Sequence, residues 1–255
     1  MYIKKYSIGI LMLFIFQLCS CGGIESQIAS NVIVPDCTTA SGDIEIYNKL
    51  NLSFYKALHL SEKNDGLYSI SEKSLEIGGN KIMIPQISDM LNLDKQEEIN
   101  SLIVENINKK MFMYSEEDVK GKFFKFKYST KFKNNKLLSF LFEGDYYAEG
   151  NAHPSLFSFG INIDLDNSII LEKKNIITID KDVTKLFNDG NFVPKNEISE
   201  SFYPIYLDNI NKQNTLSVLE ISEICFSDEG IEFIIETNYA TGGYMLLELP
   251  YMLLE

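Results

Sequence analysis

His153 is the residue best suited to acid–base chemistry in this sequence. Glu143, Asp145 and Glu149 precede it, and Ser155 follows two positions later. Serine, histidine and a carboxylate are the components of a hydrolase triad, which requires them in hydrogen-bond contact. Because the segment has no nucleophile-elbow motif, we predict no catalytic residue, and we expect the imidazole to hold the local turn by bonding backbone groups. A hydrolase site around His153 is the alternative.

Metal ligands are sparse in the sequence. The second histidine, His59, lies far from His153, and no cysteine–histidine cluster has the spacing of a zinc site. We therefore predict neither a metal nor another cofactor. Among 36 acidic residues, no carboxylate pair for glycoside cleavage can be singled out.

The charge of the chain excludes one class of partner. All 23 basic residues are lysines, and with 36 acidic residues the 255-residue chain has a net charge of −13. Such a charge repels a phosphate backbone, so we expect no nucleic-acid binding. An acidic surface either attracts a basic partner or simply maintains solubility, and both explanations stay open.

Tyrosines provide a second kind of recognition chemistry. Tyr146, Tyr147 and Tyr244 combine a flat apolar ring with a hydroxyl group, which suits a sugar ring or a protein partner. Core packing is the alternative for each of them, because about half of the side chains of a strand point inward.

The N-terminus is typical of an export signal. Lys4 and Lys5 precede the apolar run 8–16, which is too short to span a bilayer comfortably. The residues Leu18-Cys19-Ser20-Cys21 resemble a bacterial lipobox. The resemblance implies that residues 1–20 are a lipoprotein signal peptide and that Cys21 is lipidated; an uncleaved signal anchor is the alternative.

The remaining chain divides into a tether and a domain. Residues 21–43 are small and polar and predict a flexible tether after lipidated Cys21, whereas residues 44–255 predict one folded domain. Two cysteines remain, Cys37 and Cys225. An exported compartment permits a disulfide between them, and two independently buried thiols are the alternative.

Periodicity predicts the elements of the domain. Apolar and polar residues alternate on both sides of residues 78–80 and 134–135, which indicates two hairpins. Further strands are expected at 156–166, 231–236 and 244–250, and helices at 182–187 and 196–210. Another helix begins at a capping box of Asp94 and Glu97. Its periodicity places Ile99, Leu102, Ile103, Ile107 and Met111 on one apolar face. Together these elements predict an α+β fold, an antiparallel sheet with helices packed on one face.

Three ordered stretches carry a family resemblance. They are Pro85-Gln86-Ile87 followed by Ile99-Asn100, then residues 146–154 (YYAEGNAHP), and finally a hairpin containing residues 240–244 (ATGGY) and ending at Leu249-Pro250-Tyr251. They are similar to motifs of the PdaC/RsiV-like module of exported bacterial envelope proteins. One departure is Asn151 in place of a glycine, at a turn where Asn tolerates a positive φ.

The resemblance implies a binding surface formed by the motif residues Tyr146, Tyr147, Gly150, Asn151, His153, Pro154, Gly242, Gly243 and Tyr244. PdaC-like deacetylases carry their chemistry in a separate domain, whose Thr-Phe-Asp-Asp-Gly motif is not found in this sequence. RsiV-like proteins bind lysozyme through the exported module and capture a sigma factor through a cytoplasmic segment. Here only a few residues precede the apolar run, so we expect no sigma-factor capture.

We therefore expect a membrane-anchored envelope lipoprotein with a non-catalytic recognition module. Its partner would be a cell-wall glycan, such as peptidoglycan, or a basic lysozyme-like protein, and its location would be the outer membrane or the outer face of the cytoplasmic membrane. A purely structural envelope lipoprotein is a further alternative.

Overall fold

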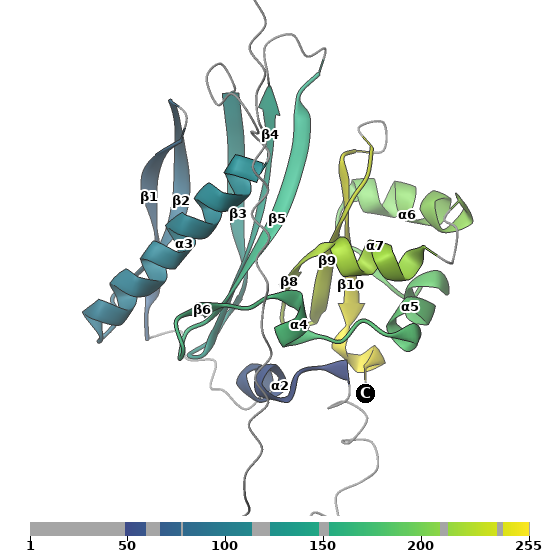
Figure 1. Ribbon diagram of the computed structural model, residues 1–255, viewed down its shortest axis with the longest axis horizontal. Coiled ribbons are helices and arrows are strands. Elements are labelled where there is room, and N and C mark those ends of the chain that lie inside the picture. Colours follow the sequence, from purple (N-terminus) through teal and green to yellow (C-terminus); the bar gives the residue numbers. More distant parts are fainter. Residues whose placement is uncertain are drawn as a thin grey trace, which may run out of the picture. The chain divides into compact units, whose positions relative to one another are not determined.

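The computed structural model describes residues 49–59, 67–77, 79–113, 123–147, 153–209, 214–238 and 242–254 (Figure 1). All of them belong to the unit formed by Thr39–Glu255. The predicted signal peptide, the tether, Cys21 and Cys37 lie outside the described residues and stay predictions. Within the described ranges, no helix is both long enough and apolar enough to cross a membrane.

The helices and strands alternate along the chain in groups. In chain order they are α2 (Leu52–His59), β1 (Ser69–Ile77), β2 (Asn80–Ser88), α3 (Leu93–Met113), β3 (Phe123–Lys133), β4 (Leu137–Tyr147), β5 (Ser155–Asp164), β6 (Ile169–Ile170), α4 (Lys173–Ile176), α5 (Lys181–Asn188), β7 (Val193–Pro194), α6 (Glu197–Asn209), α7 (Thr215–Ile221), β8 (Glu223–Phe226), β9 (Gly230–Glu236), β10 (Tyr244–Pro250) and the short 3-10 helix η2 (Tyr251–Leu253).

The described strands form antiparallel sheets, which confirms the α+β class. One sheet has the order β3-β4-β5-β6, a second has the order β7-β10-β9-β8, and β1 and β2 form a separate hairpin. The predicted single sheet is therefore divided into two, called here the β3–β6 sheet and the β7–β10 sheet. Helices cover one face of each sheet, as Figure 1 shows for α3 and for α5 to α7.

Helix α3 packs on the β3–β6 sheet through the face that its periodicity predicted. Ile99, Ile103 and Ile107 are completely buried there against the aromatic side of β4 and β5, which includes Phe140 and Phe142. Residues three or four apart share one side of a helix, and these isoleucines bury the apolar surface that stabilises the packing.

The start of α3 differs from the predicted capping box. Asn92, rather than Asp94, caps the helix: its side-chain oxygen accepts a hydrogen bond from the Lys95 backbone N–H at 3.0 Å, and its carbonyl accepts one from Gln96 at 3.1 Å. Asparagine is among the preferred N-cap residues. The helix consequently begins at Leu93, and Asp94 lies within its first turn.

The first motif of the family resemblance has a clear physical role. The Asn100 side chain accepts a hydrogen bond from the Ile87 N–H at 2.7 Å and donates one to the Ile87 carbonyl at 2.9 Å. The amide thus imitates a neighbouring strand at the edge of β2. This contact attaches the β1–β2 hairpin to α3.

A second apolar core lies on the helical side of the β7–β10 sheet. Alternate residues of β8 to β10, including Phe226, Phe233 and Leu247, are fully buried against α2 and α4 to α7. Lys173 of α4 connects this helical layer to the C-terminal end of α7. Its ammonium group donates to the carbonyls of Leu219, Glu220 and Ser222 at 2.5 to 2.7 Å.

The two sheets face each other through a layer that is partly polar. Lys131 of β3 and the buried Glu232 of β9 form an ion pair at 2.8 Å. Asn162 of β5 donates to the carbonyl of Ile224 in β8 at 2.8 Å. At Gly160 the strands approach so closely that a Cβ atom would lie 2.0 Å from that same carbonyl oxygen.

Candidate functional site

Two hairpins carrying the predicted motifs meet at one end of the sheets. Gly243, at the turn between β9 and β10, has a φ of +79°, and a Cβ atom there would lie 2.8 Å from the Cβ of Leu156 on β5. Gly242 has a φ of +88° and approaches Ile198 of α6 in the same way, at 2.5 Å. Glycine is required at both positions, because positive φ and close contact each disfavour a side chain.

The meeting point encloses a cavity of about 270 Å³, called here the tyrosine cavity. Its wall is formed by the starting residues of β5 and by the facing ends of β4, β9 and β10. The lining residues are Tyr146, Ser155, Leu156, Phe157, Ser158, Glu236, Thr237, Gly243 and Tyr244.

Two cross-strand pairs form the polar part of this site. Glu143 of β4 is the register partner of Ser158 on β5, and Glu236 of β9 is the register partner of Tyr244 on β10. The Tyr244 hydroxyl donates a 2.6 Å hydrogen bond to Glu143, which connects the two pairs. Burial raises the pKa of Tyr244, and the hydrogen bond to Glu143 raises it further. The phenol therefore stays protonated and acts as a donor at neutral pH.

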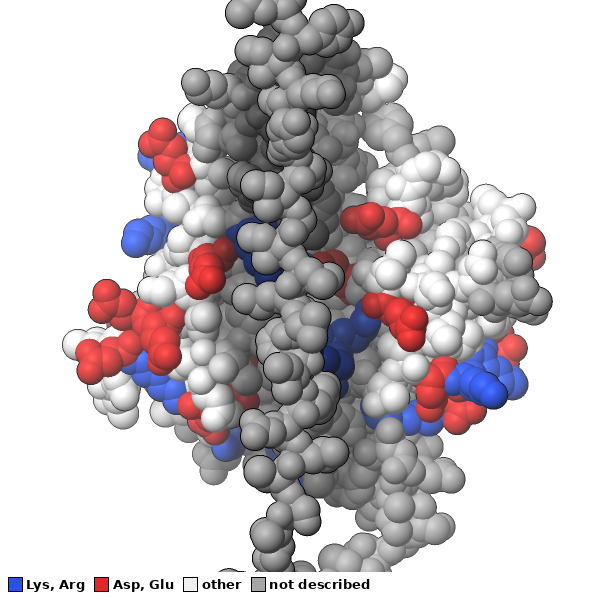
Figure 2. Space-filling model, viewed as in Figure 1, with Lys and Arg blue, Asp and Glu red and all other residues white. Residues whose placement is uncertain are grey.

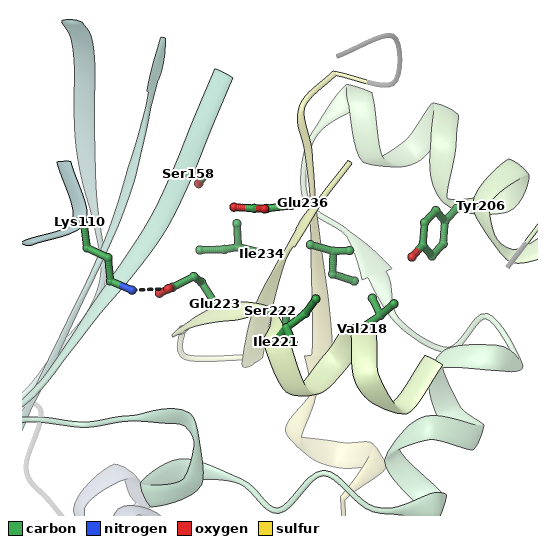
Figure 3. A pocket seen from close by; sticks show the side chains of 10 residues that line it. Lys110, Ser158, Tyr206, Val218, Ile221, Ser222, Glu223, Ile234 and Glu236 are labelled. Carbon is green, nitrogen blue, oxygen red and sulfur yellow. Dashed lines mark hydrogen bonds and ion pairs between the residues drawn. The ribbon is translucent and has the colours of Figure 1, made fainter. Parts of the chain in front are cut away.

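A second cavity of about 380 Å³, the central cavity, continues from the first. Both cavities are lined by Ser158 and Glu236, so they form one groove between β5 and the β7–β10 sheet. In Figure 3 the Glu236 side chain extends from β9 toward Ser158, above the apolar Ile234. An ion pair between Lys110 of α3 and Glu223 of β8 closes the other end.

Glu236 is the free charge of this groove. Among the described residues, its carboxylate has no hydrogen-bond or ion-pair partner, whereas Glu143 accepts from Tyr244 and lies 3.6 Å from the Lys127 ammonium. In Figure 2 acidic and basic side chains both lie on the two halves of the visible face, and further basic side chains lie deeper between the halves. The unpaired carboxylate of Glu236 favours a ligand that brings a positive charge to its own end of the groove.

Three of the predicted binding residues lie in this groove. Tyr146, Gly243 and Tyr244 line the tyrosine cavity together, although about a hundred residues separate the first from the others. Gly242 lies in the same turn, where it packs closely against Ile198 of α6. Tyr147 is 40% exposed and is not a lining residue of either cavity.

The remaining predicted residues lie elsewhere. His153 is exposed and Pro154 is half-buried just before β5, and neither lines the groove. Gly150 and Asn151 lie outside the described residues. Ser155, the serine considered together with His153, does line the tyrosine cavity, whereas His153 is not among its lining residues. The hydrolase alternative around His153 stays a prediction.

The tyrosine rings mostly pack rather than present a flat surface. Tyr146 packs against the core beneath α3, with its ring 6.4 Å from that of Phe157, and Tyr244 is only 9% exposed. A sugar ring needs an accessible aromatic face for stacking. Within the groove, the accessible chemistry is instead carboxylate, hydroxyl and backbone.

Sequence reasoning missed Ser158 and Glu236 as site residues. A usable signal was present in β5 and β9, because both residues alternate with fully buried neighbours such as Phe157 and Ile235 and so belong to the opposite sheet face. That this face meets the other sheet follows only from the tertiary arrangement.

Metal ligation finds no support in the described ranges, where no group of three or more His, Cys, Asp or Glu side chains is placed to hold an ion. Among the described residues Cys225 has no disulfide partner, and its thiol is completely buried. Its sulfur donates to Glu232 at 3.3 Å, and burial and that carboxylate raise its pKa well above the ordinary value. Since Cys37 is not among the described residues, the predicted bridge between them stays a prediction.

Comparison with known proteins adds little beyond this geometry. No protein-family model matches the chain, and no curated protein matches it. A solved structure of a DUF3298 family member from Bacteroides fragilis NCTC 9343 is 11% identical, covering 72% of this chain and 89% of that one, with a TM-score of 0.39. A DUF3298 family protein from Pseudomonas aeruginosa PAO1 is also 11% identical, covering 73% and 90%, with a TM-score of 0.40. Likeness at this level carries no functional argument.

Proposed function

We propose that this chain is an exported, lipid-anchored recognition protein whose groove binds a basic protein of the lysozyme type. The observation that carries the proposal is Glu236, a carboxylate without a partner among the described residues that lines both cavities of the groove. The net charge of −13 also attracts a positively charged partner. Opposite charge accelerates encounter and selects the partner.

The alternative partner, a cell-wall glycan, has weaker support in this groove. Its aromatic rings are packed or nearly buried, so the stacking surface expected for a sugar is small. Soluble peptidoglycan fragments nevertheless serve as the second ligand in the test.

Titration of the full chain in detergent with lysozyme tests the partner. We expect binding that weakens as salt is added, because screening shortens the range of the attraction. Glu236→Gln keeps the shape of the side chain and removes its charge, so it should weaken binding about fivefold to tenfold. Glu200→Gln on α6, an exposed position outside the groove, is the matched control and should bind like the wild type.

Equal affinities of the Glu236→Gln and Glu200→Gln variants for lysozyme would show that lysozyme does not bind in the groove. Binding of peptidoglycan fragments in place of lysozyme would replace the partner. Binding of neither would refute a recognition role of this kind.

Lipid anchoring is tested separately through Cys21. An acylated cysteine anchors a protein because each buried methylene contributes about 0.8 kcal/mol. The wild-type chain should occur in the membrane fraction with fatty acids on its N-terminal cysteine, measured by mass spectrometry, and Cys21→Ser should move it to the soluble fraction. An unmodified chain that keeps residues 1–20 would contradict this part of the proposal.

A further inference from the structure

Exposed apolar side chains are concentrated on a few segments of the described structure. Among its described residues, thirteen large apolar side chains are exposed, and seven of them lie on α2, β6, η2 and the residues directly before β1 and at the start of α3. The seven are Leu52, Leu67, Leu91, Leu93, Ile169, Met252 and Leu253. Single exposed apolar side chains are ordinary, whereas a concentration of them on one surface marks contact with a partner or a membrane.

Polar contacts join these segments into one end of the domain. Lys95, in the first turn of α3, lies 4.0 Å from Asp166 between β5 and β6, and Lys136 contacts the same carboxylate at 2.7 Å. The turn between β3 and β4 reaches α2, because the Asn134 amide donates to the Ala57 carbonyl at 2.9 Å. Figure 1 shows β6, α2 and the C-terminus at the lower edge of the view.

Two further contacts attach η2 and the start of β1 to the same end. The His59 ring of α2 lies 5.8 Å from the Tyr251 ring of η2. The Tyr68 hydroxyl, directly before β1, donates to the Asn134 carbonyl at 3.0 Å. The surface formed by the seven exposed apolar residues is called here the apolar end.

The charges at the apolar end do not form a basic patch. Lys95 and Lys136 share the Asp166 carboxylate, and the exposed Asp89 and Asp94 lie close in sequence to the leucines before and at the start of α3. A chain with a net charge of −13 is also repelled by anionic lipids. The surface that fits these features is a zwitterionic lipid surface, which apolar side chains enter without help from charge.

The position of the proposed anchor favours a lipid surface over a protein partner. Lys49, the first described residue, lies three positions before α2 and therefore close to the apolar end. Residues 22–48, which separate it from Cys21, would span roughly 30 Å as the predicted flexible tether. A short flexible link of this kind keeps the domain at a high local concentration beside the bilayer.

We propose that the apolar end rests on the lipid surface, with its leucines inserted between head groups and acyl chains. This inference rests on the lipid anchor of the proposed function and adds the orientation of the anchored domain. Strand β4 runs from Leu137, beside the apolar end, to Tyr146, which lines the tyrosine cavity. At about 3.3 Å per residue these positions are roughly 30 Å apart. The tyrosine cavity is thereby held away from the membrane and open to a partner from solution.

Tryptophan fluorescence tests the orientation, because the natural chain contains no tryptophan. Leu91 is 97% exposed and Met252 is 74% exposed, so Leu91→Trp and Met252→Trp place single reporters at two sides of the apolar end. The full chain is reconstituted in phosphatidylcholine vesicles whose acyl chains are brominated near the head groups. Both reporters should lose at least about half of their emission to bromine, since interfacial side chains reach the boundary of the acyl chains.

Ile205→Trp on α6 is the control reporter, because Ile205 is 54% exposed but is not part of the apolar end. Its emission should stay unchanged in brominated vesicles. Equal quenching of all three reporters would overturn the proposed orientation. An acylated chain in which either reporter of the apolar end stays unquenched would also overturn it, and the lipid anchor would stand.

Two other outcomes separate the inference from the anchor. Quenching of both reporters in a chain without fatty acids would support the lipid contact and refute the anchor. Unquenched reporters whose emission shifts as the protein concentration rises would assign the apolar end to a second copy of the chain and overturn the inference.

Polar substitutions give an independent test in the Met252→Trp chain. Adding Leu91→Gln together with Leu93→Gln removes apolar surface from the contact, so at least about half of the lost emission should return. Leu216→Gln on α7, at a position 39% exposed and outside the apolar end, is the matched control and should restore nothing. Equal quenching with and without the two glutamines would count against insertion of these leucines.

Discussion

Replacing Gly243 by alanine tests how the groove is built. The variant combines two costs, a positive φ and a contact of 2.8 Å with the Cβ of Leu156. A left-handed backbone costs an L-residue about 1–2 kcal/mol. Carbon atoms prefer separations near 3.5–4.0 Å, so one hairpin must move by roughly 1 Å, which adds about 1–3 kcal/mol as overpacking does.

Gly79 provides the matched control for this variant. It has nearly the same φ, +80°, and a Cβ atom there would meet nothing within 4 Å. In urea titrations at constant m value, we expect Gly79→Ala to lose about 1–2 kcal/mol of unfolding free energy and Gly243→Ala about 2–5 kcal/mol. Leu156→Ala should not rescue Gly243→Ala, because the contacting atom is the Cβ itself. Equal losses in the two glycine variants would refute the close approach of β5 and the β9–β10 turn.

Variants of three further contacts test the packing around the sheets. Lys131→Met leaves the buried Glu232 carboxylate without its cation and should lower the free energy of unfolding by about 3 kcal/mol in urea titrations. Lys127→Met is the control: it breaks an ion pair with Glu143 whose lysine is 78% exposed, so it should lower the free energy of unfolding by less than about 1 kcal/mol. Because the pKa of Tyr244 is raised on folding, its contribution is complete below pH 10 and lost as the pH rises above it; Tyr244→Phe should therefore show a smaller loss of stability above pH 10. Asn100→Ala removes both bonds to Ile87 and should cost about 2–3 kcal/mol, and Asn100→Asp, which can accept but not donate, should fall between it and the wild type.

Long periodic segments were predictable because local patterns determine them. The isoleucine face of α3, the two hairpins and the strands at the C-terminus agree with their predicted positions. Short elements were missed: α7 and β8 have seven and four residues, too few for a period to be visible. β8 ends at Phe226, which packs in the core.

The candidate site was only partly predictable. The family resemblance pointed to Tyr146, Gly243 and Tyr244, which the fold brings together. Glu236 and Ser158 become site residues only through contacts between distant strands. The division of one predicted sheet into two facing sheets is not visible in any local pattern. Gly160 illustrates this, since its role depends on a carbonyl 64 positions later in the chain.

The polar layer between the sheets has a consequence for how a partner is received. Hydrogen bonds and ion pairs have preferred geometries, so the contacts of Lys131 with Glu232 and of Asn162 with Ile224 favour one alignment of the two sheets. The width of the opening beside β5 is thus set before any encounter. A ligand therefore meets a groove whose width is already fixed, and little of the binding free energy is needed to rearrange the two sheets.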